Sequence, residues 1–397
     1  MALFSLVSAV AGFVKLRYLI DKAVIDNFVF RMHYRLTSAI LFLCCIIITA
    51  NNLLGEPISC LSELTNGAHV VNTFCWITST FTLPGTLAKP VGTHVAHPGL
   101  GLDEGGDKRY HQYYQWVPFM LFLQGLLFYM PHWMWKQWEE GKMRLISEGM
   151  RGTMVETKQE RQAKIERIVQ YLTDTMHLHN SYAAGYFFCE VLNFVNTIGN
   201  IFFVDVFLGG SFLTYGMNVV KWSTLNQDER SDPMIEIFPR LTKCTFHKYG
   251  ASGSIQSYDA LCVLALNIFN EKIYIFLWFW FIILAVCSGV ALMYSMAIVL
   301  MPSTRETILR KRFKFGTKST VSTLIRKTQV GDFLMIHLLG QNMNVMMFND
   351  MLEELCRRLQ FGSSSDASPT SVPSAPSTLE MSPIYPEIEK FSKDTEI

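Results

Sequence analysis

Charged residues are scarce in this sequence, and neither sign of charge predominates. Asp, Glu, Lys and Arg together make up 17% of the chain, whereas hydrophobic residues make up 50%. Since an ordinary soluble domain has about 25% charged residues, this composition indicates a membrane protein. The formal net charge of +1 gives no basic surface for nucleic acid. We therefore expect a lipid bilayer as a partner and no nucleic acid.

Recognisable catalytic motifs are also missing from the sequence. It has no Walker loop, no dinucleotide-binding fingerprint, no G-x-S-x-G elbow and no zinc-spaced cluster of Cys and His. A helical metal pair needs a spacing of three or four residues, so we interpret His177 and His179 as solvent-facing. Internal repeats and paired broken helices, which are typical of transporters, are absent too. We expect no enzyme, no cofactor and no metal.

Four long stretches with few or no charges are present. A hydrocarbon core of about 30 Å requires about 20 mostly apolar residues per helix. The predicted spans are 36–55, 110–135, 182–204 and 273–302.

The third of these spans carries a polar stripe. Glu190 interrupts it, and three asparagines recur at nearly helical spacing, namely Asn193, Asn196 and Asn200. A charge at the bilayer centre costs ~2.5–3.5 kcal/mol on insertion scales. We therefore expect Glu190 to face the bundle interior, and favour a structural partner over a role in ion selectivity. The alternative is a helix lying on the membrane surface, which would leave an odd number of crossings.

The distribution of Lys and Arg around the spans predicts the orientation. Basic residues such as Arg31, Lys136 and Arg310 lie on the same side of the spans, which predicts that both termini are cytoplasmic. The segments between the spans are then a cytoplasmic N-terminal helix and linker (1–35), a first extracellular loop (56–109), a cytoplasmic helical segment (136–181), a second extracellular loop (205–272), another cytoplasmic helical segment (303–361) and a disordered tail rich in Ser and Pro (362–397).

The N-terminal run 1–14 is apolar but too short to span a bilayer, and no basic residue precedes it as in a secretory signal. Ser5 and Ser8 are three residues apart and can share one face of a helix. We predict that this face lines the cytoplasmic mouth of a pore. The alternative is a helix lying on the inner leaflet.

The nine cysteines divide by predicted compartment. Five lie in spans or in the cytoplasmic tail, where reduced thiols are expected. The first outside loop has Cys60 and Cys75, and the second has Cys244 and Cys262, an even set that predicts two disulfides. Cys60 and Cys262 both lie near a membrane span, which favours the nested pairs Cys60–Cys262 and Cys75–Cys244 over pairs within one loop. The predicted fold class is thus an all-α integral membrane protein, a four-transmembrane-helix bundle with disulfide-tied extracellular loops and a helical cytoplasmic layer.

The second span begins with the motif Tyr113, Tyr114, Gln115, Trp116, Val117 and Pro118. This motif resembles the signature of innexins, the invertebrate gap-junction proteins. Segments 26–34, 239–244 and 270–280 also look like the insect type, so the similarity covers roughly residues 1–360. Two cysteines in each outside loop match this family, whereas connexins have three, and claudins and tetraspanins place their cysteines differently.

The resemblance implies a passive channel. Subunits of such proteins form a ring in one membrane, rings on two cells dock through the outside loops, and the joined pore passes ions and small metabolites. It suggests eight subunits, in homo- or hetero-oligomeric rings with other innexins, in the plasma membrane at cell-cell junctions. The alternatives are an undocked hemichannel that releases small molecules to the extracellular space, and an adhesion or scaffold role without conduction.

Neither predicted outside loop contains an Asn-x-Ser/Thr acceptor for a glycan. The triplets that begin at Asn66, Asn72, Asn218, Asn226 and Asn267 all fail at the third position. A bulky glycan would keep two rings apart, and the related pannexins, which are generally glycosylated there, mostly act undocked. The absence of an acceptor therefore favours the junctional function.

Overall fold

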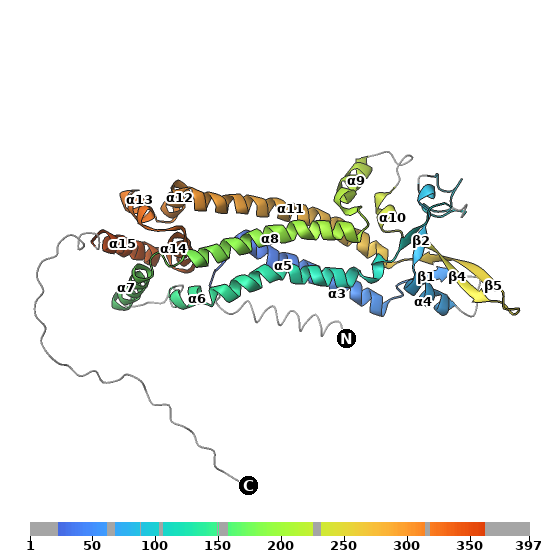
Figure 1. Cartoon of the computed structure of the whole chain (residues 1–397), viewed down its shortest axis with the longest axis horizontal. Coiled ribbons are helices and arrows are strands. Elements are labelled where there is room, and N and C mark those ends of the chain that lie inside the picture. The colour runs from blue at the N-terminus through green and yellow to red at the C-terminus, as the bar shows by residue number, and fades with distance from the viewer. Residues whose placement is uncertain are drawn as a thin grey trace, which may run out of the picture.

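The structure is a computed structural model of the chain, and it describes residues 23–61, 68–87, 89–102, 106–148, 150, 158–224, 232–313 and 318–361. Four long helical segments run side by side through its middle (Figure 1). The first comprises α2 Phe28–Arg31, the π-helical η1 Met32–Thr37 and α3 Ser38–Leu54, and the others are α5 Val117–Glu139, α8 Asn180–Phe207 and α11 Leu266–Leu300. Because α3 packs on α5, α5 on α8, α8 on α11 and α11 on α3, the four form a closed bundle.

Three of these segments are long and apolar enough to cross a membrane, namely Phe28–Leu54, Asn180–Phe207 and Leu266–Leu300. The helix α5 is not among them, because Gln124, Pro131 and His132 interrupt its apolar sequence. Apolar side chains are nevertheless exposed on the outside of all four segments, for example Leu43, Phe119, Val195 and Val286. The bundle of helices is therefore observed, whereas four membrane crossings remain a prediction.

The two long connections at one end of the bundle build a single antiparallel sheet (Figure 1). Its strands, β1 Ser59–Leu61, β2 Thr80–Thr82, β3 Arg109–His111, β4 Leu241–Tyr249 and β5 Ile255–Val263, lie in the order β1-β5-β4-β2-β3. The same connections contain α4 Ala68–Thr78, η2 Pro84–Thr86, η3 Tyr113–Gln115, α9 Phe212–Thr224 and α10 Pro233–Ile237. We call the five strands together with α4 the sheet cap.

The sheet cap corrects the predicted fold class. The chain is mostly helical, but the description as all-α is wrong for the two loops. Thr242 and Cys244 are buried on β4 while their neighbours are more exposed, and such alternation is the pattern of a half-buried strand. The apolar positions of this strand pack against α4, so a sheet rather than a helix forms.

Helices at the opposite end of the bundle form a second unit, which we call the helical layer. It contains α6 Lys142–Ile146, α7 Lys158–Asp174, α12 Pro302–Arg312, α13 Lys318–Lys327, α14 Val330–Asn342 and α15 Val345–Phe361. The central helix α14 is buried over most of its length, and α15 packs on α7 and α13. Phe30, Trp135 and Tyr186 from the bundle share one apolar core with this layer, so the two units pack as one body.

Candidate functional site

Two disulfides hold the sheet cap together. Cys60 on β1 lies directly opposite Cys262 on β5, with 4.0 Å between the Cα atoms, and the two are bonded. Cys75 on α4 is bonded to Cys244 on β4 across 5.9 Å. Each bond joins the first loop to the second, which is the nested pattern. The cap therefore cannot separate into two independent loops.

The disulfides also account for the one group of ligand-type side chains that gathers in the described part of the chain. The sulfur atoms of Cys60, Cys75 and Cys262 lie within 4.8 Å of one another. A metal site would need free thiolates, and both disulfides consume them. The cluster is therefore covalent and structural.

The residues of the motif 113–118 fasten the cap to the bundle. Tyr114 is fully buried and its ring lies 4.6 Å from that of Trp76 on α4. Gln115 Nε2 donates a hydrogen bond to the Trp76 carbonyl, and the carbonyl of Pro118 accepts one from Cys45 Sγ at 3.3 Å. Trp116, in contrast, is exposed. Tyr114, Gln115 and Pro118 therefore support the joint between β3 and α5.

Glu190 lies inside the bundle and has two hydrogen-bond partners. Its Oε1 accepts from Asn27 Nδ2 at 2.7 Å, and its Oε2 accepts from Ser295 Oγ at 2.5 Å. Asn27 caps the first helix, because its Oδ1 accepts from the backbone N–H of Phe30. One carboxylate thus joins α8, α11 and the start of the first helix. The choice between a structural role and ion selectivity stays a prediction.

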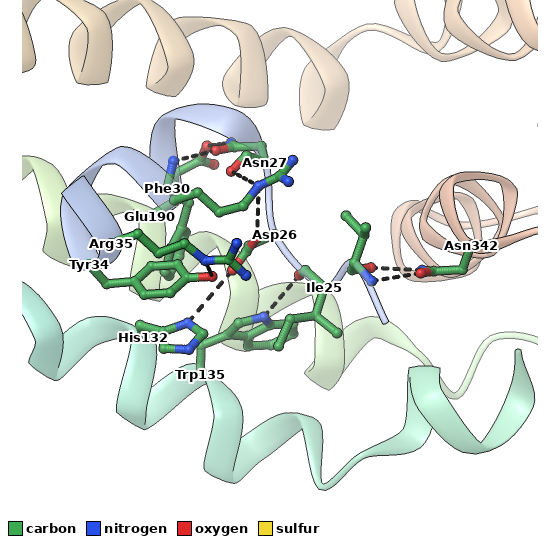
Figure 2. Close-up of polar contacts among 12 residues, drawn as sticks. Ile25, Asp26, Asn27, Phe30, Tyr34, Arg35, His132, Trp135, Glu190 and Asn342 are labelled. Carbon is green, nitrogen blue, oxygen red and sulfur yellow. Dashed lines mark hydrogen bonds and ion pairs between the residues drawn. The ribbon is translucent and has the colours of Figure 1, made fainter. Parts of the chain in front are cut away.

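A second buried carboxylate, Asp26, precedes the first helix (Figure 2). It is 3% exposed and lies 3.3 Å from Arg31 Nε and 3.6 Å from His132 Nδ1. The ring of His132 stacks on Tyr34 with 3.6 Å between centroids. Burial raises the pKa of Asp26 to about 6, although the nearby Tyr34 hydroxyl and Arg31 oppose this shift.

The backbone on either side of Asp26 is also held from two directions. Trp135 Nε1 on α5 donates to the Ile25 carbonyl at 3.0 Å. Asn342 on α14 donates to the Val24 carbonyl at 2.7 Å and accepts from the Val24 N–H at 2.6 Å. We call residues 24–27 the strap, since they connect the helical layer to the first helix (Figure 2). These contacts could not be predicted from the sequence, because Trp135 and Asn342 are each more than 100 residues from the strap along the chain.

The remaining predicted positions are Ser5 and Ser8, near the start of the chain, and the histidines His177 and His179. Ser5 and Ser8 lie outside the described residues. The interpretation of His179 as solvent-facing is wrong, because it is buried and its Nδ1 lies 3.0 Å from Asp332 Oδ1, whereas the His177 side chain is exposed. Burial opposes ionisation of Asp332, but hydrogen bonds from His179 and from the backbone N–H groups of Gln329 and His177 together hold its pKa below the usual value.

Together, the geometry defines a class: a helical membrane protein with two disulfide-tied loops at one end and a helical layer at the other. The innexin family model matches residues 26–359. The chain is 57% identical to Innexin inx3 of Drosophila melanogaster over the full length of both proteins. It is 42% identical to Innexin inx2 of Schistocerca americana, over 90% of this chain and 99% of the relative, and 45% identical to Innexin inx2 of Drosophila melanogaster, over 90% and 96%.

The chain therefore belongs to the innexin family. Innexins are gap-junction channel proteins of the plasma membrane and are not enzymes.

Proposed function

We propose that this chain is a structural subunit of a gap-junction channel that passes ions and small metabolites between adjacent cells. The observation that supports this function most strongly is the sheet cap, in which strands of both loops form one sheet and two disulfides fix it at one end of the bundle. A preorganised surface loses less conformational entropy on association than two mobile loops would. Such a cap is suited to docking with an opposed ring.

The β4–β5 hairpin provides a candidate contact surface on the cap. It extends away from the bundle (Figure 1), and Tyr249 and Ile255 at its end are 73% and 68% exposed. Aromatic and apolar side chains are typical of the buried centre of protein interfaces. We assign the hairpin end to the face that meets the opposed ring.

The proposed topology has four crossings, the cap outside the cell and both termini inside. Disulfides persist in an oxidising compartment, which supports an extracellular cap. The helical layer lies at the other end and contains the basic residues Arg310, Lys311 and Arg312, as expected on the cytoplasmic side. An epitope tag at the C-terminus should be accessible to antibody only after the cells are permeabilised, and staining of intact cells would contradict this topology.

We also propose a ring of eight subunits, homomeric or mixed with other innexins, in which Ser5 and Ser8 line the cytoplasmic mouth of the pore. The strap supports this placement, because it is held at the helical-layer end of the bundle and the first residues lead into it. A Ser5→Cys or Ser8→Cys channel should lose conductance after reaction with a charged thiol reagent. Confirmed labelling with unchanged conductance would contradict the pore assignment, and the mass of the purified ring checks the subunit count.

Recording from cell pairs and from single cells tests the proposed function. Cells that express the chain should show conductance between paired cells, and dye should pass between them. Conductance in single cells without coupling would identify an undocked hemichannel. Adhesion without any conductance would identify a scaffold.

A further inference from the structure

A pocket of about 550 Å³ lies where α11 meets the helical layer. It is lined by Tyr294 from α11, His337 from α14, and Ser303, Thr304, Thr307, Ile308, Lys311 and Arg312 from α12. This volume is within the usual range for small-molecule sites, about 300–1,000 Å³. None of the channel features described above uses this pocket.

The lining side chains suit an anion. Lys311 and Arg312 are cationic, and no lining residue is acidic. Among the described residues, neither cation has a carboxylate partner. Ser303 and Thr304 lie in the first turn of α12, whereas Lys311 and Arg312 lie in its last turn, so the hydroxyl groups and the cations line different ends of the pocket. The pocket therefore contains two full positive charges together with hydroxyl donors.

Arg312 is the cation for which a counterion matters most. It is half-buried, and its Nε approaches Gly340 of α14 so closely that a Cβ there would lie 3.3 Å away. Burial lowers the pKa of Arg312, which means that the protein solvates this charge less well than water does. An anion in the pocket would compensate that loss.

His337 adds a neutral donor to the same pocket. Burial and the adjacent Arg312 lower its pKa to about 4, so the ring is uncharged at neutral pH. Its Nε2 lies 3.0 Å from Gln341 Nε2. If the Gln341 amide donates this bond, the proton of the imidazole is on Nδ1 and is available to a ligand.

The surroundings of the pocket favour a lipid as the source of the anion. Met293, Met296 and Leu300 on the last turns of α11 are 66%, 52% and 68% exposed, and Tyr294 beside them is a type of residue enriched at membrane interfaces. Apolar surface for acyl chains thus lies next to cationic groups for a headgroup. Anionic lipids attract basic residues that lie near the membrane surface.

We infer that this pocket, the α12 pocket, binds a phosphate-bearing anion, supplied by the headgroup of an anionic lipid or by a soluble phosphate compound of the same chemistry. Its position at the inner leaflet rests on the proposed topology. The binding chemistry itself rests only on the residues that line the pocket.

The test uses the full-length protein in neutral detergent and three probes: short-chain phosphatidylinositol bisphosphate, soluble inositol trisphosphate, and short-chain phosphatidylcholine as the uncharged control. Lys311→Glu should reduce affinity for the lipid at least about tenfold, since reversing one contacting charge exceeds 1.4 kcal/mol. Arg310→Gln removes a neighbouring charge of α12 that does not line the pocket, and should change affinity by less than about twofold.

Each outcome has a distinct meaning. If wild-type protein binds both phosphate probes and Lys311→Glu binds neither, the phosphate groups alone are sufficient for binding. If wild-type protein binds the lipid but not inositol trisphosphate, the acyl chains are also required. Absence of binding, or equal effects of the two variants, overturns the inference. Cell-pair recordings of Lys311→Glu distinguish this inference from the proposed function. Coupling between cells without phosphate binding would overturn the inference but support the gap-junction function. Phosphate binding by wild-type protein that never couples cells would overturn the gap-junction function but support the inference.

Discussion

Glu190 and Asp26 are buried carboxylates near the same end of the bundle, yet their surroundings differ. Glu190 receives hydrogen bonds from two neutral donors, Asn27 and Ser295. Asp26 is instead close to Arg31 and His132. Because each carboxylate has a different kind of partner, the two should respond differently to loss of charge.

Replacement of Glu190 should affect stability more than ion selectivity. Glu190→Gln retains a carbonyl acceptor for Asn27 and can donate its amide to Ser295, so we expect a loss on the order of 1 kcal/mol. Glu190→Ala leaves both partners without their acceptor and should cost about 2–3 kcal/mol and reduce ring assembly. Thermal unfolding and size-exclusion chromatography measure these effects, and reversal potentials measure cation preference. A changed cation preference in a Glu190→Gln ring that assembles normally would assign the residue to selectivity instead.

The stability contributed by Asp26 should rise as the pH falls. Its pKa in the folded protein is about 6, above the unfolded value of about 3.9, so the folded state binds its proton more tightly. This contribution is fully present below about pH 4 and is lost as the pH rises through about 6. Thermal unfolding of wild type should therefore show a slope between about pH 4 and 6 that Asp26→Asn removes, worth on the order of 2–3 kcal/mol in total.

Asp332→Asn is the matched control for that experiment. Asp332 is another buried acid, but its pKa is lowered, so its contribution is lost only below about pH 4. Asp332→Asn should lower the free energy of unfolding by a similar amount at every pH in this range, so the slope of stability against pH should stay the same as in wild type. An unchanged slope in Asp26→Asn would show that another group is responsible.

Among the elements, the helices follow from local sequence and the sheet does not. Runs of apolar residues and amphipathic periodicity in the chain are sufficient to predict the bundle and the helical layer. The β4–β5 hairpin pairs residues that are near in sequence, but assembly of the whole sheet depends on residues far apart, as in Cys60 opposite Cys262 and Phe81 opposite Lys243. Short strands such as β1 have only three residues, which is too few for a periodic pattern to be visible.

The candidate sites divide in the same way. The four cysteines that form disulfides could be predicted because they lie in the predicted extracellular loops. Four cysteines allow only three pairings, and their order along the chain favours one of them. The strap and the α12 pocket could not, since Asn342 with Val24, and His337 with Arg312, come together only through the packing of α14 against the bundle and α12.

Loss of one disulfide in the cap should disrupt docking and expose a specific partner. Removing a native disulfide from a small extracellular unit typically costs about 2–5 kcal/mol. Cys60→Ser should therefore abolish coupling between cells and leave Cys262 as the new free thiol, which alkylation of unreduced protein and mass spectrometry identify. Cys287→Ser, a change at a cysteine outside the disulfides, should retain coupling. Alkylation of Cys75 in Cys60→Ser would overturn the nested pairing.

At the scale of the whole molecule, the strap is a direct connection between the helical layer and the bundle. Asn342 holds its beginning, and Glu190 holds its end through Asn27. Hydrogen bonds through the strap therefore connect α14 to the start of the first helix. The sheet cap, at the far end of the bundle, is positioned separately by its disulfides and by the contacts of Tyr114 and Gln115 with Trp76.

Whether two whole molecules meet through their caps can be decided by adding a glycan. Ala68→Thr completes an Asn-Gly-Thr acceptor that begins at Asn66, next to α4 of the sheet cap. A bulky, hydrated glycan on each subunit should prevent close approach of two rings, so coupling between cells should be lost while conductance in single cells persists. Ala68→Val introduces a side chain of nearly the same shape without an acceptor and should couple normally, and Asn66→Gln in the Ala68→Thr background should restore coupling. If the glycosylated variant couples neighbouring cells at normal conductance, then this part of the cap is not at the docking face, or the rings do not dock through their caps.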